Sequence, residues 1–300
     1  MNKEIKELFD AQLENWPLAL SNYKNLENIK TKQFNYDGFD VNVQFNPARV
    51  VSSGAKVDTK SIAERKCFLC STNRPTEQEG IQLEQYSILV NPFPIFPEHF
   101  TIVHNQHLPQ QIKPFFNDLL SFAEKLSDYV LFYNGPKCGA SAPDHLHFQA
   151  GTKSFLPLLT DYEKLKQKNT ICFFKNTTCE VYLLDNYLRT VICIESNDKF
   201  SANDYFLQLY DDLQGTSLEE PMMNIVCNFQ DNKWFTFIFP REQFRPWQYH
   251  AEEPNQLMVS PATVEMSGVF ITPIESHFQK IKGDDIISIF EQISMGYEIK

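Results

Sequence analysis

One order of predicted elements occurs twice along the chain, and it restricts the fold more than any other feature of the sequence. In the first half, strand-like segments at residues 86–90 and 100–104 precede an amphipathic helical pattern at 109–127 and two more strands. In the second half, a hairpin pattern, a helix at residues 201–213 and a second hairpin pattern follow in the same order. Neighbouring strands joined by short turns pair antiparallel. The sequence therefore predicts an α+β fold with two similar halves, each an antiparallel sheet with packed helices.

The two halves are expected to divide near residue 160. We assign residues 1–160 to the first half and residues 161–300 to the second on pattern alone, because no sequence identity between the halves is visible. Near the C-terminal end, "TVEMSGVFITP" predicts a strand, and residues 276–294 predict a last helix. Each half would then have its own sheet and its own covering helices.

Charge and composition exclude several classes of protein. The 300 residues carry a formal net charge of −11, so the broad basic surface that nucleic-acid binding requires is absent. The sequence has no run of about eighteen apolar residues and no signal-peptide pattern, so no membrane span is predicted. The 7 cysteines are odd in number and indicate no disulfide framework. We therefore expect a cytoplasmic protein that binds neither nucleic acid nor a membrane.

The stretch "DHLHFQA", residues 144–150, alternates polar and apolar side chains. Successive side chains of a strand point to opposite faces, so His145, His147 and Gln149 would share one face. Two uses fit this row. Either the histidines bind a metal ion, or one of them is a nucleophile whose neighbours orient it and bind an oxyanion. An ordinary solvent-facing strand would show the same alternation, so the row alone does not decide.

The loop before this row favours the nucleophile. The segment "NGPKCGAS", residues 134–141, contains two glycines and two other small residues. Such a loop lets backbone N–H groups approach a phosphate closely, while Ser141 adds a hydroxyl donor and Lys137 a positive charge. Joined to the histidine row, the loop suggests a histidine that is aimed at a phosphorus atom.

The combined segment "NGPKCGASAPDHLHFQ" resembles the signature of the histidine-triad (HIT) superfamily, in its transferase branch. In that branch glutamine replaces the third histidine, and its members include galactose-1-phosphate uridylyltransferase, diadenosine tetraphosphate phosphorylase and GDP-L-galactose phosphorylase. The segments "NPAR", "LVNPFPIFPEHFTIVH" and "NIVCNFQDNKWFTFIFPRE" also resemble segments of these enzymes. The resemblance thus extends over most of residues 45–245 and implies a HIT-like fold in both halves.

This resemblance implies a two-step nucleotidyl transfer. In the family, the middle histidine of the row attacks the α-phosphorus and forms a nucleotidyl–histidine intermediate, which makes His147 the expected nucleophile. Gln149 and Ser141 would donate hydrogen bonds to phosphate oxygens on which charge develops. The expected substrate is a nucleotide-sugar or a dinucleoside polyphosphate, the expected acceptor is phosphate or a sugar phosphate, and a homodimer is expected because such transferases are often dimers. Further substrate contacts are expected from Arg49, Asn91, Asn134, Lys137, Gly139 and Arg241.

The pair Cys67 and Cys70, in "CFLC", has the spacing of a metal or redox site. A thioredoxin-like redox pair should lie at the start of a helix, whereas the residues that follow Cys70 are typical of a loop. The two cysteines could also be incidental thiols without a shared function. A zinc site needs two more nitrogen or sulfur ligands, and zinc-binding uridylyltransferases take them from two histidines. The resemblance therefore implies a structural, tetrahedral zinc site with the ligands Cys67, Cys70, His107 and His145, with His104 as a rival to His107.

Two other functions stay open at the level of the sequence. A metal-dependent hydrolase would use His145 and His147 together as ligands, although no carboxylate or third histidine for that metal stands out nearby. A non-catalytic nucleotide-binding protein would keep the same loop and the same zinc site. The base and the sugar of the substrate are not determined by the sequence, because base selection depends on the shape of the pocket.

Overall fold

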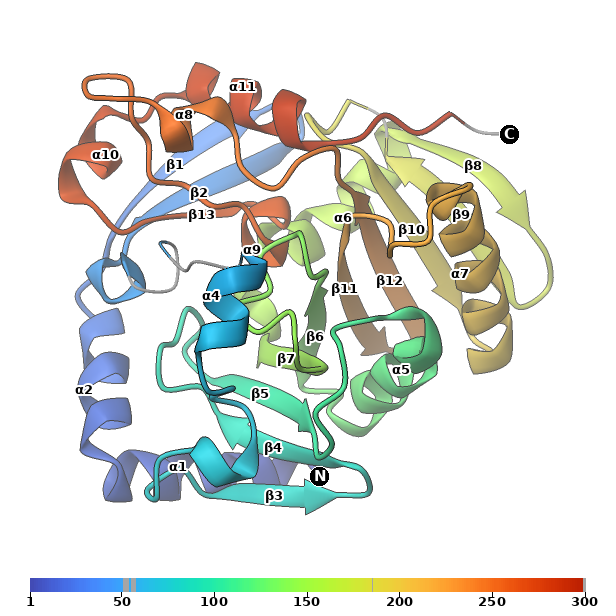
Figure 1. Cartoon of the computed structure of the whole chain (residues 1–300). Helices are drawn as coiled ribbons and strands as arrows, with labels where there is room; N and C mark the ends of the chain where they lie inside the picture. The colour runs from blue at the N-terminus through green and yellow to red at the C-terminus, as the bar shows by residue number, and fades with distance from the viewer. Residues whose placement is uncertain (51–53, 55–57, 185, 299–300) are drawn as a thin grey trace.

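A large antiparallel sheet is the centre of the structure, a computed structural model that describes residues 1–50, 54, 58–184 and 186–298. Within these residues, ten strands follow the spatial order β3-β4-β5-β7-β6-β11-β12-β10-β9-β8 (Figure 1). The strands of the first half are β3 (Gly80–Leu83), β4 (Tyr86–Val90), β5 (His99–His104), β6 (Tyr129–Asn134) and β7 (His147–Thr152). Those of the second half are β8 (Thr170–Lys175), β9 (Cys179–Leu184), β10 (Val191–Ser196), β11 (Met223–Gln230) and β12 (Lys233–Pro240).

The two groups of five strands have the same internal order. In each group the first three strands are neighbours, and the fifth strand is inserted between the third and the fourth. The fourth strands, β6 and β11, then pair with each other at the centre, from Asn134 opposite Asn224 to Leu131 opposite Cys227. All these pairs are antiparallel, so the predicted α+β class is confirmed, with one continuous sheet across both halves.

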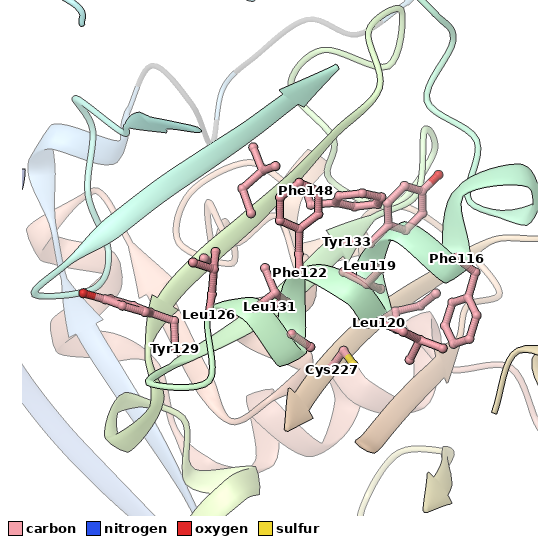
Figure 2. Close-up of a cluster of buried hydrophobic side chains, with 14 of the residues drawn as sticks. Phe116, Leu119, Leu120, Phe122, Leu126, Tyr129, Leu131, Tyr133, Phe148 and Cys227 are labelled. Atoms are coloured by element: carbon pink, nitrogen blue, oxygen red, sulfur yellow. The ribbon is translucent and has the colours of Figure 1, made fainter. Parts of the chain in front are cut away.

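Helices cover one face of this sheet. They are α1 (Asn2–Asn15), α2 (Pro17–Leu26), α5 (Phe116–Lys125) and α7 (Lys199–Gln214), and their apolar side chains form one buried cluster with the sheet. Figure 2 shows α5 side chains such as Phe122 beside Leu131 of β6 and Phe148 of β7. Burying a side chain the size of phenylalanine stabilises a fold by roughly 1.5–3 kcal/mol. Phe148 alternates with His147 and Gln149, so this packing turns both polar side chains to the other face.

A small second sheet lies over that other face. It joins the N-terminal hairpin β1 (Lys30–Tyr36) and β2 (Phe39–Phe45) to β13 (Val269–Thr272), which runs parallel to β2 (Figure 1). Segments from both ends of the chain are therefore side by side. The helices α6 (Pro157–Lys168), α9 (Thr263–Met266), α10 (Glu275–Lys280) and α11 (Gly283–Ile293) contribute to the second buried cluster between the layers. The short elements that remain are η1 (Pro47–Arg49), α4 (Thr59–Glu64), η2 (Ser71–Asn73), η3 (Lys113–Phe115), η4 (Lys153–Phe155) and α8 (Trp247–His250).

Several predicted boundaries were wrong. The helix expected at 109–127 spans only Phe116–Lys125, because the prolines before it hold a loop and a 3₁₀ turn. The strand expected in "TVEMSGVFITP" begins only at Val269, after helix α9 and Gly268, whose φ of +100° favours glycine. The single helix expected at 276–294 is two helices, α10 and α11.

The described part of the chain contains no helix with the length and apolar character that crossing a membrane requires.

Candidate active site

A cleft of about 520 Å³ opens on the face of the sheet that carries the polar row. One wall comes from the first half, including His147 and Gln149 of β7. The opposite wall comes from the C-terminal part of the chain, including Ala262 and Glu265. The cleft therefore needs both halves. It is lined by seven of the residues predicted to act in catalysis or substrate binding: Arg49, Asn91, Asn134, Gly139, Ser141, His147 and Gln149.

The ring of His147 is fixed in one orientation. Its Nδ1 lies 2.8 Å from the backbone carbonyl oxygen of His145, to which a protonated Nδ1 donates. In the neutral ring this bond leaves the lone pair on Nε2. His147 is only 4% exposed, yet it lines the cleft. The geometry thus makes Nε2 the ring nitrogen available for reaction.

Burial keeps this ring neutral. Loss of hydration, which penalises the charged form, is the main cause that lowers the pKa of His147 from its ordinary 6.5 to about 4. The hydrogen bond to the His145 carbonyl acts in the opposite direction but is the weaker effect. At neutral pH the imidazole therefore keeps the lone pair that a nucleophile requires.

The backbone at His147 is held by Gln110, from the loop before α5. The Gln110 side-chain oxygen accepts from the backbone N–H of His147 at 2.8 Å. Its amide nitrogen donates to the carbonyl oxygens of Asn134 and His147, both at 3.0 Å. One buried amide thus ties the start of β7 to the end of β6, which limits movement of the His147 ring relative to the loop.

Gln149 is oriented by a histidine of the neighbouring strand. Nδ1 of His99 accepts from the backbone N–H of Ile95 at 3.2 Å, so the proton of the neutral ring lies on Nε2. His99 Nε2 lies 2.9 Å from Oε1 of Gln149 and donates to it. Burial first, and Arg49 second, lower the pKa of His99 to about 3, which keeps the ring neutral. With Oε1 occupied, Gln149 offers its NH₂ group, a donor, to the cleft.

The loop that carries Ser141 is anchored from the second half. Gly139 has a φ of +98°, and a Cβ at this position would lie 2.4 Å from the Cβ of Ala262. Asn224 of β11 donates to the carbonyl oxygen of Cys138 at 2.7 Å and to Oδ1 of Asn134 at 3.0 Å. Glycine is thus required by both backbone conformation and close packing.

Two predicted substrate residues do not line the cleft. Lys137 is exposed and forms an ion pair with Glu219. Arg241 is fully buried, and its guanidinium donates to Asn224 and to backbone carbonyls that include Ile293 and Pro261. Arg241 therefore supports the anchor of the loop from behind, and a direct contact with substrate would require these bonds to break.

Arg49 and Glu265 also line the cleft and bring ionisable groups to it. Arg49 donates to the carbonyl oxygen of Phe93 at 2.8 Å. Glu265 accepts from the backbone N–H of Ala262 at 2.9 Å. Burial raises the pKa of the Glu265 carboxyl to about 7, against the lowering effect of Arg49 nearby. No motif or spacing in the sequence indicated Glu265 as a site residue.

The four predicted metal ligands come together beside the cleft. One ligand atom from each of Cys67, Cys70, His107 and His145 lies within 4.8 Å of the others. Nδ1 of His145 lies 3.3 Å from Sγ of Cys67 and 3.2 Å from Nδ1 of His107, and Cys70 Sγ lies 3.2 Å from Nδ1 of His107. Zinc bonds of about 2.3 Å to sulfur and 2.0 Å to nitrogen place tetrahedral ligands about 3.3–3.8 Å apart. The cluster therefore fits a metal ion of that kind.

The hydrogen bonds of His145 and of His104, the rival candidate ligand, are consistent with this cluster. Nε2 of His145 donates to the carbonyl oxygen of His104 at 2.7 Å, which leaves Nδ1 for a metal. The imidazole of His104 itself binds Gln106 and Gln85 and is not part of the cluster. His147 is also outside the cluster, so the geometry gives no support to a shared metal on His145 and His147.

Sequence analysis missed His99, Gln110 and Asn224, which position the residues that it found. Only His99 has a readable signal, since alternation in "HFTIVH" puts it on one face with Thr101, which lies opposite Gln149. The pairing of β5 with β7 could not be read from the chain, because β7 enters the sheet only after β6 and the loop that follows it.

Family models match both halves of the chain. Residues 8–152 match a domain of unknown function, DUF4922, and residues 162–298 match the C-terminal domain of the GDPGP1-like family. The cleft takes its two walls from these two matched regions, since Gln149 belongs to the first and Glu265 to the second.

Similar proteins of known name are uridylyltransferases. Galactose-1-phosphate uridylyltransferase of Bacillus subtilis (strain 168) is 29% identical over 138 residues, which cover 37% of this chain and 27% of that protein. The enzyme of the same name from Staphylococcus saprophyticus is 24% identical over 207 residues, which cover 62% of this chain and 40% of that protein. The chain thus spans less than half the length of these relatives.

Among solved structures, yeast Ap4A phosphorylase Apa2 has the same fold over nearly the whole chain. The TM-score is 0.62 at 18% identity, and the match covers 96% of this chain and 97% of Apa2. The complex of Apa2 with Ap4A matches with a TM-score of 0.58 at 15% identity, over 95% of this chain and 97% of that one. The H-x-H-x-Q row, the family matches and the uridylyltransferase relatives support a relation of this chain to the transferase branch of the histidine-triad superfamily, and the solved structures show the same fold.

Proposed function

We propose that the protein is a nucleotidyltransferase or nucleotide phosphorylase that works through a covalent nucleotidyl–His147 intermediate. The observation that carries this proposal is the buried, neutral His147, whose Nδ1 is bound to the His145 carbonyl at 2.8 Å inside a cleft of about 520 Å³. Such a ring has a single nitrogen free to attack.

In the first step, Nε2 of His147 attacks the α-phosphorus of the donor. A nitrogen–phosphorus bond forms, and the bond from phosphorus to the leaving phosphate oxygen breaks, with the electron pair on that oxygen. The imidazolium that results is stabilised by the Nδ1 bond to the His145 carbonyl, which strengthens when the ring is charged. The leaving group is a sugar phosphate or a nucleoside polyphosphate.

In the second step, an oxygen of the acceptor attacks the same phosphorus, and the nitrogen–phosphorus bond breaks. His147 returns to its neutral form, and the product is a nucleoside diphosphate or a new nucleotide-sugar. The acceptor is inorganic phosphate in a phosphorylase and a sugar phosphate in a transferase. Because both steps use one histidine, the reaction should follow ping-pong kinetics.

Charge that develops on the phosphate oxygens would be met by donors already in place. Two such donors are the NH₂ group of Gln149, which His99 holds in place, and the hydroxyl of Ser141. Both residues line the cleft with His147. Asn91, Asn134, Gly139 and Arg49 line the same cleft and are proposed to hold the rest of the substrate. Fixed donors in a site that excludes water stabilise such charge more than water does.

The metal at the cysteine–histidine cluster is proposed to be zinc. The ligand set of two sulfurs and two nitrogens suits zinc, and all four positions come from the protein. A closed site of this kind would supply structural rigidity. It would hold His145, and with it the carbonyl that fixes the His147 ring.

The substrate class is proposed from the relatives. The similar proteins are named for galactose-1-phosphate uridylyl transfer and for Ap4A phosphorolysis, so a nucleotide-sugar and a dinucleoside polyphosphate are both retained. The division into halves at residue 160, a homodimer and a cytoplasmic location stay predictions.

The test is an incubation of the pure protein with GDP-, UDP- and ADP-sugars and with dinucleoside polyphosphates, followed by intact mass measurement. We expect a gain of one nucleoside monophosphate, which also identifies the base. The same incubation with His147→Gly should give no adduct. If wild type forms no adduct with any donor while metal analysis finds zinc, the proposal is wrong and a non-catalytic binding protein is favoured.

A further inference from the structure

Asp144 stands between the metal-binding cluster and the cleft. Its Oδ2 lies 3.8 Å from Nε2 of His107, the ring nitrogen that does not face the cysteines. Its Oδ1 accepts from Nη2 of Arg65 at 2.6 Å. One oxygen of the Asp144 carboxylate therefore faces a histidine of the metal cluster, and the other binds an arginine that lines the cleft.

Arg65 extends from this carboxylate to the cleft. Its side chain lines the cleft, and its guanidinium lies 5.1 Å from the ring centroid of Phe68. Nη2 also lies 3.4 Å from the carbonyl oxygen of Ser141. Nη1 is buried and has no hydrogen-bond partner among the described residues. A buried donor without a partner is costly, so a movement of the guanidinium that brings Nη1 into the cleft, where a ligand oxygen accepts from it, would be favourable.

We infer that Asp144 and Arg65 form a positioning pair that links the metal site to substrate binding. Asp144 orients the His107 ring for the metal and at the same time holds the Arg65 guanidinium beside Ser141. Arg65 presents its remaining donor to a phosphate oxygen of the substrate. The part that concerns substrate rests on the proposed nucleotidyl transfer, whereas the part that concerns the metal rests only on the proposed zinc site.

The physical basis of this link is the shared carboxylate. At 3.8 Å, Oδ2 of Asp144 is beyond hydrogen-bond distance from Nε2 of His107, so the carboxylate acts on this ring through its negative charge, which favours a ring that donates charge to a metal. A guanidinium held on one side by a carboxylate keeps a fixed plane, so its other donors are already oriented for a phosphate. Three arginines, Arg49, Arg65 and Arg245, line the cleft of a chain with a net charge of −11, and Arg65 contacts Asp144 beside the metal cluster.

The experiment compares Asp144→Asn and Arg65→Gln with a matched control, Asp211→Asn. Asp211 forms an exposed ion pair with Lys113, so the control also removes one negative charge from one ion pair. Zinc affinity is measured by competition with a chromophoric chelator, and binding of inorganic pyrophosphate by titration calorimetry on the zinc-loaded protein. Circular dichroism checks that each variant is folded.

The expected pattern separates the two residues. Asp144→Asn should raise the zinc dissociation constant about tenfold, the low end of the range for outer partners of metal-bound histidines, because the contact acts by charge at 3.8 Å and not through a hydrogen bond. Arg65→Gln should leave zinc affinity unchanged and weaken pyrophosphate binding about tenfold, because one charge-assisted bond is lost. Asp144→Asn should weaken pyrophosphate binding too, and Asp211→Asn should change neither quantity.

Two outcomes would overturn the inference. Unchanged zinc affinity in Asp144→Asn would show that the carboxylate does not position His107. Pyrophosphate binding by Arg65→Gln equal to that of Asp211→Asn would show that Arg65 does not contact phosphate. Neither measurement requires nucleotidyl transfer, so failure of this inference is distinguishable from failure of the proposed function.

Discussion

Strands β7 and β12 hold equivalent places in the two halves of the sheet. On the same face of the sheet, however, β7 carries polar side chains and β12 carries an apolar one. A line of paired residues crosses the sheet from Gln149 through Phe132 and Val226 to Phe237 and shows that these side chains share a face. On β7 that face carries His147 and Gln149 and opens on the cleft. On β12 it carries Phe237, which is 1% exposed.

The difference arises from what covers each half. Tyr162 of helix α6 packs on Phe237 with ring centroids 4.8 Å apart, which closes the face over β12. Over β7 the cover is the segment around Ala262 and Glu265, and the cleft lies between it and the strand. One strand arrangement thus yields a closed apolar core in one half and a polar cleft in the other. The choice depends on the side chains at equivalent positions and on the element above them.

The largest effect should come from removing the nucleophile. His147→Gly should lower the rate of nucleotidyl transfer by more than about 1,000-fold, because the remaining donors bind the substrate but form no covalent bond. Single-turnover kinetics with the best donor measures this rate. Zinc content should stay at the wild-type value, and the variant should stay folded with a lower free energy of unfolding, because glycine replaces a buried side chain within a strand. A loss of zinc in this variant would instead make His147 a metal ligand.

The matched change on the other strand should affect stability and not chemistry. Phe237→Ala should lower the free energy of unfolding by about 3–5 kcal/mol, because it leaves a cavity under Tyr162. Urea denaturation measures this change. The rate of adduct formation by the folded variant should equal that of wild type. A reduced rate in fully folded Phe237→Ala would contradict the separation of the two halves into core and site.

The metal site should respond to His145, the first histidine of the row, and not to His104, the rival candidate for the place of His107. His145→Ala should lower zinc content, and it should also slow adduct formation because the carbonyl that orients His147 loses its support. His104→Ala, the control, should retain zinc. Metal analysis of the purified variants decides. Unchanged zinc in His145→Ala would refute the ligand assignment.

His99 and Gln149 should act as one unit. Gln149→Ala and His99→Phe should each slow adduct formation about 10–100-fold, because an oriented donor to the phosphate is lost or misdirected. The double variant should be about as slow as Gln149→Ala alone, since the two residues share one interaction. Additive losses in this double-mutant cycle would mean that His99 acts in some other way.

The smallest effect is a shift in pH dependence. Because burial lowers the pKa of His147 to about 4, adduct formation should stay constant down to about pH 5 and fall below it. The same shift should reduce the free energy of unfolding as pH falls from 6.5 toward 4, because the unfolded chain binds a proton that the folded ring refuses. A rate that falls near pH 6.5 would show that His147 is not buried as described.

The sequence predicted those parts of the site that depend on residues close together in the chain. It did not predict the contacts between residues far apart in the chain. The row, the loop and the CFLC pair lie within short segments, so alternation, glycine content and spacing indicated them. The four metal ligands were named from a family resemblance, and the structure brings them together. The contacts of Gln110 with His147 and of His99 with Gln149 depend on strand pairing across the sheet, which no local pattern records. The break between α10 and α11 was missed for a different reason, because the apolar residues on both sides of it suggested one continuous helix.

The central claim is that Nε2 of His147 carries the nucleotide during turnover. The direct measurement is to mix the wild-type protein with the donor that gives an adduct, quench at alkaline pH where phosphohistidine bonds survive, digest the chain and locate the nucleoside monophosphate by fragmentation. The account predicts that the label lies on His147 and on no other histidine. A label on His145, His99 or His107 would contradict it, because it would place the reactive nitrogen outside the oriented, neutral ring that the cleft presents.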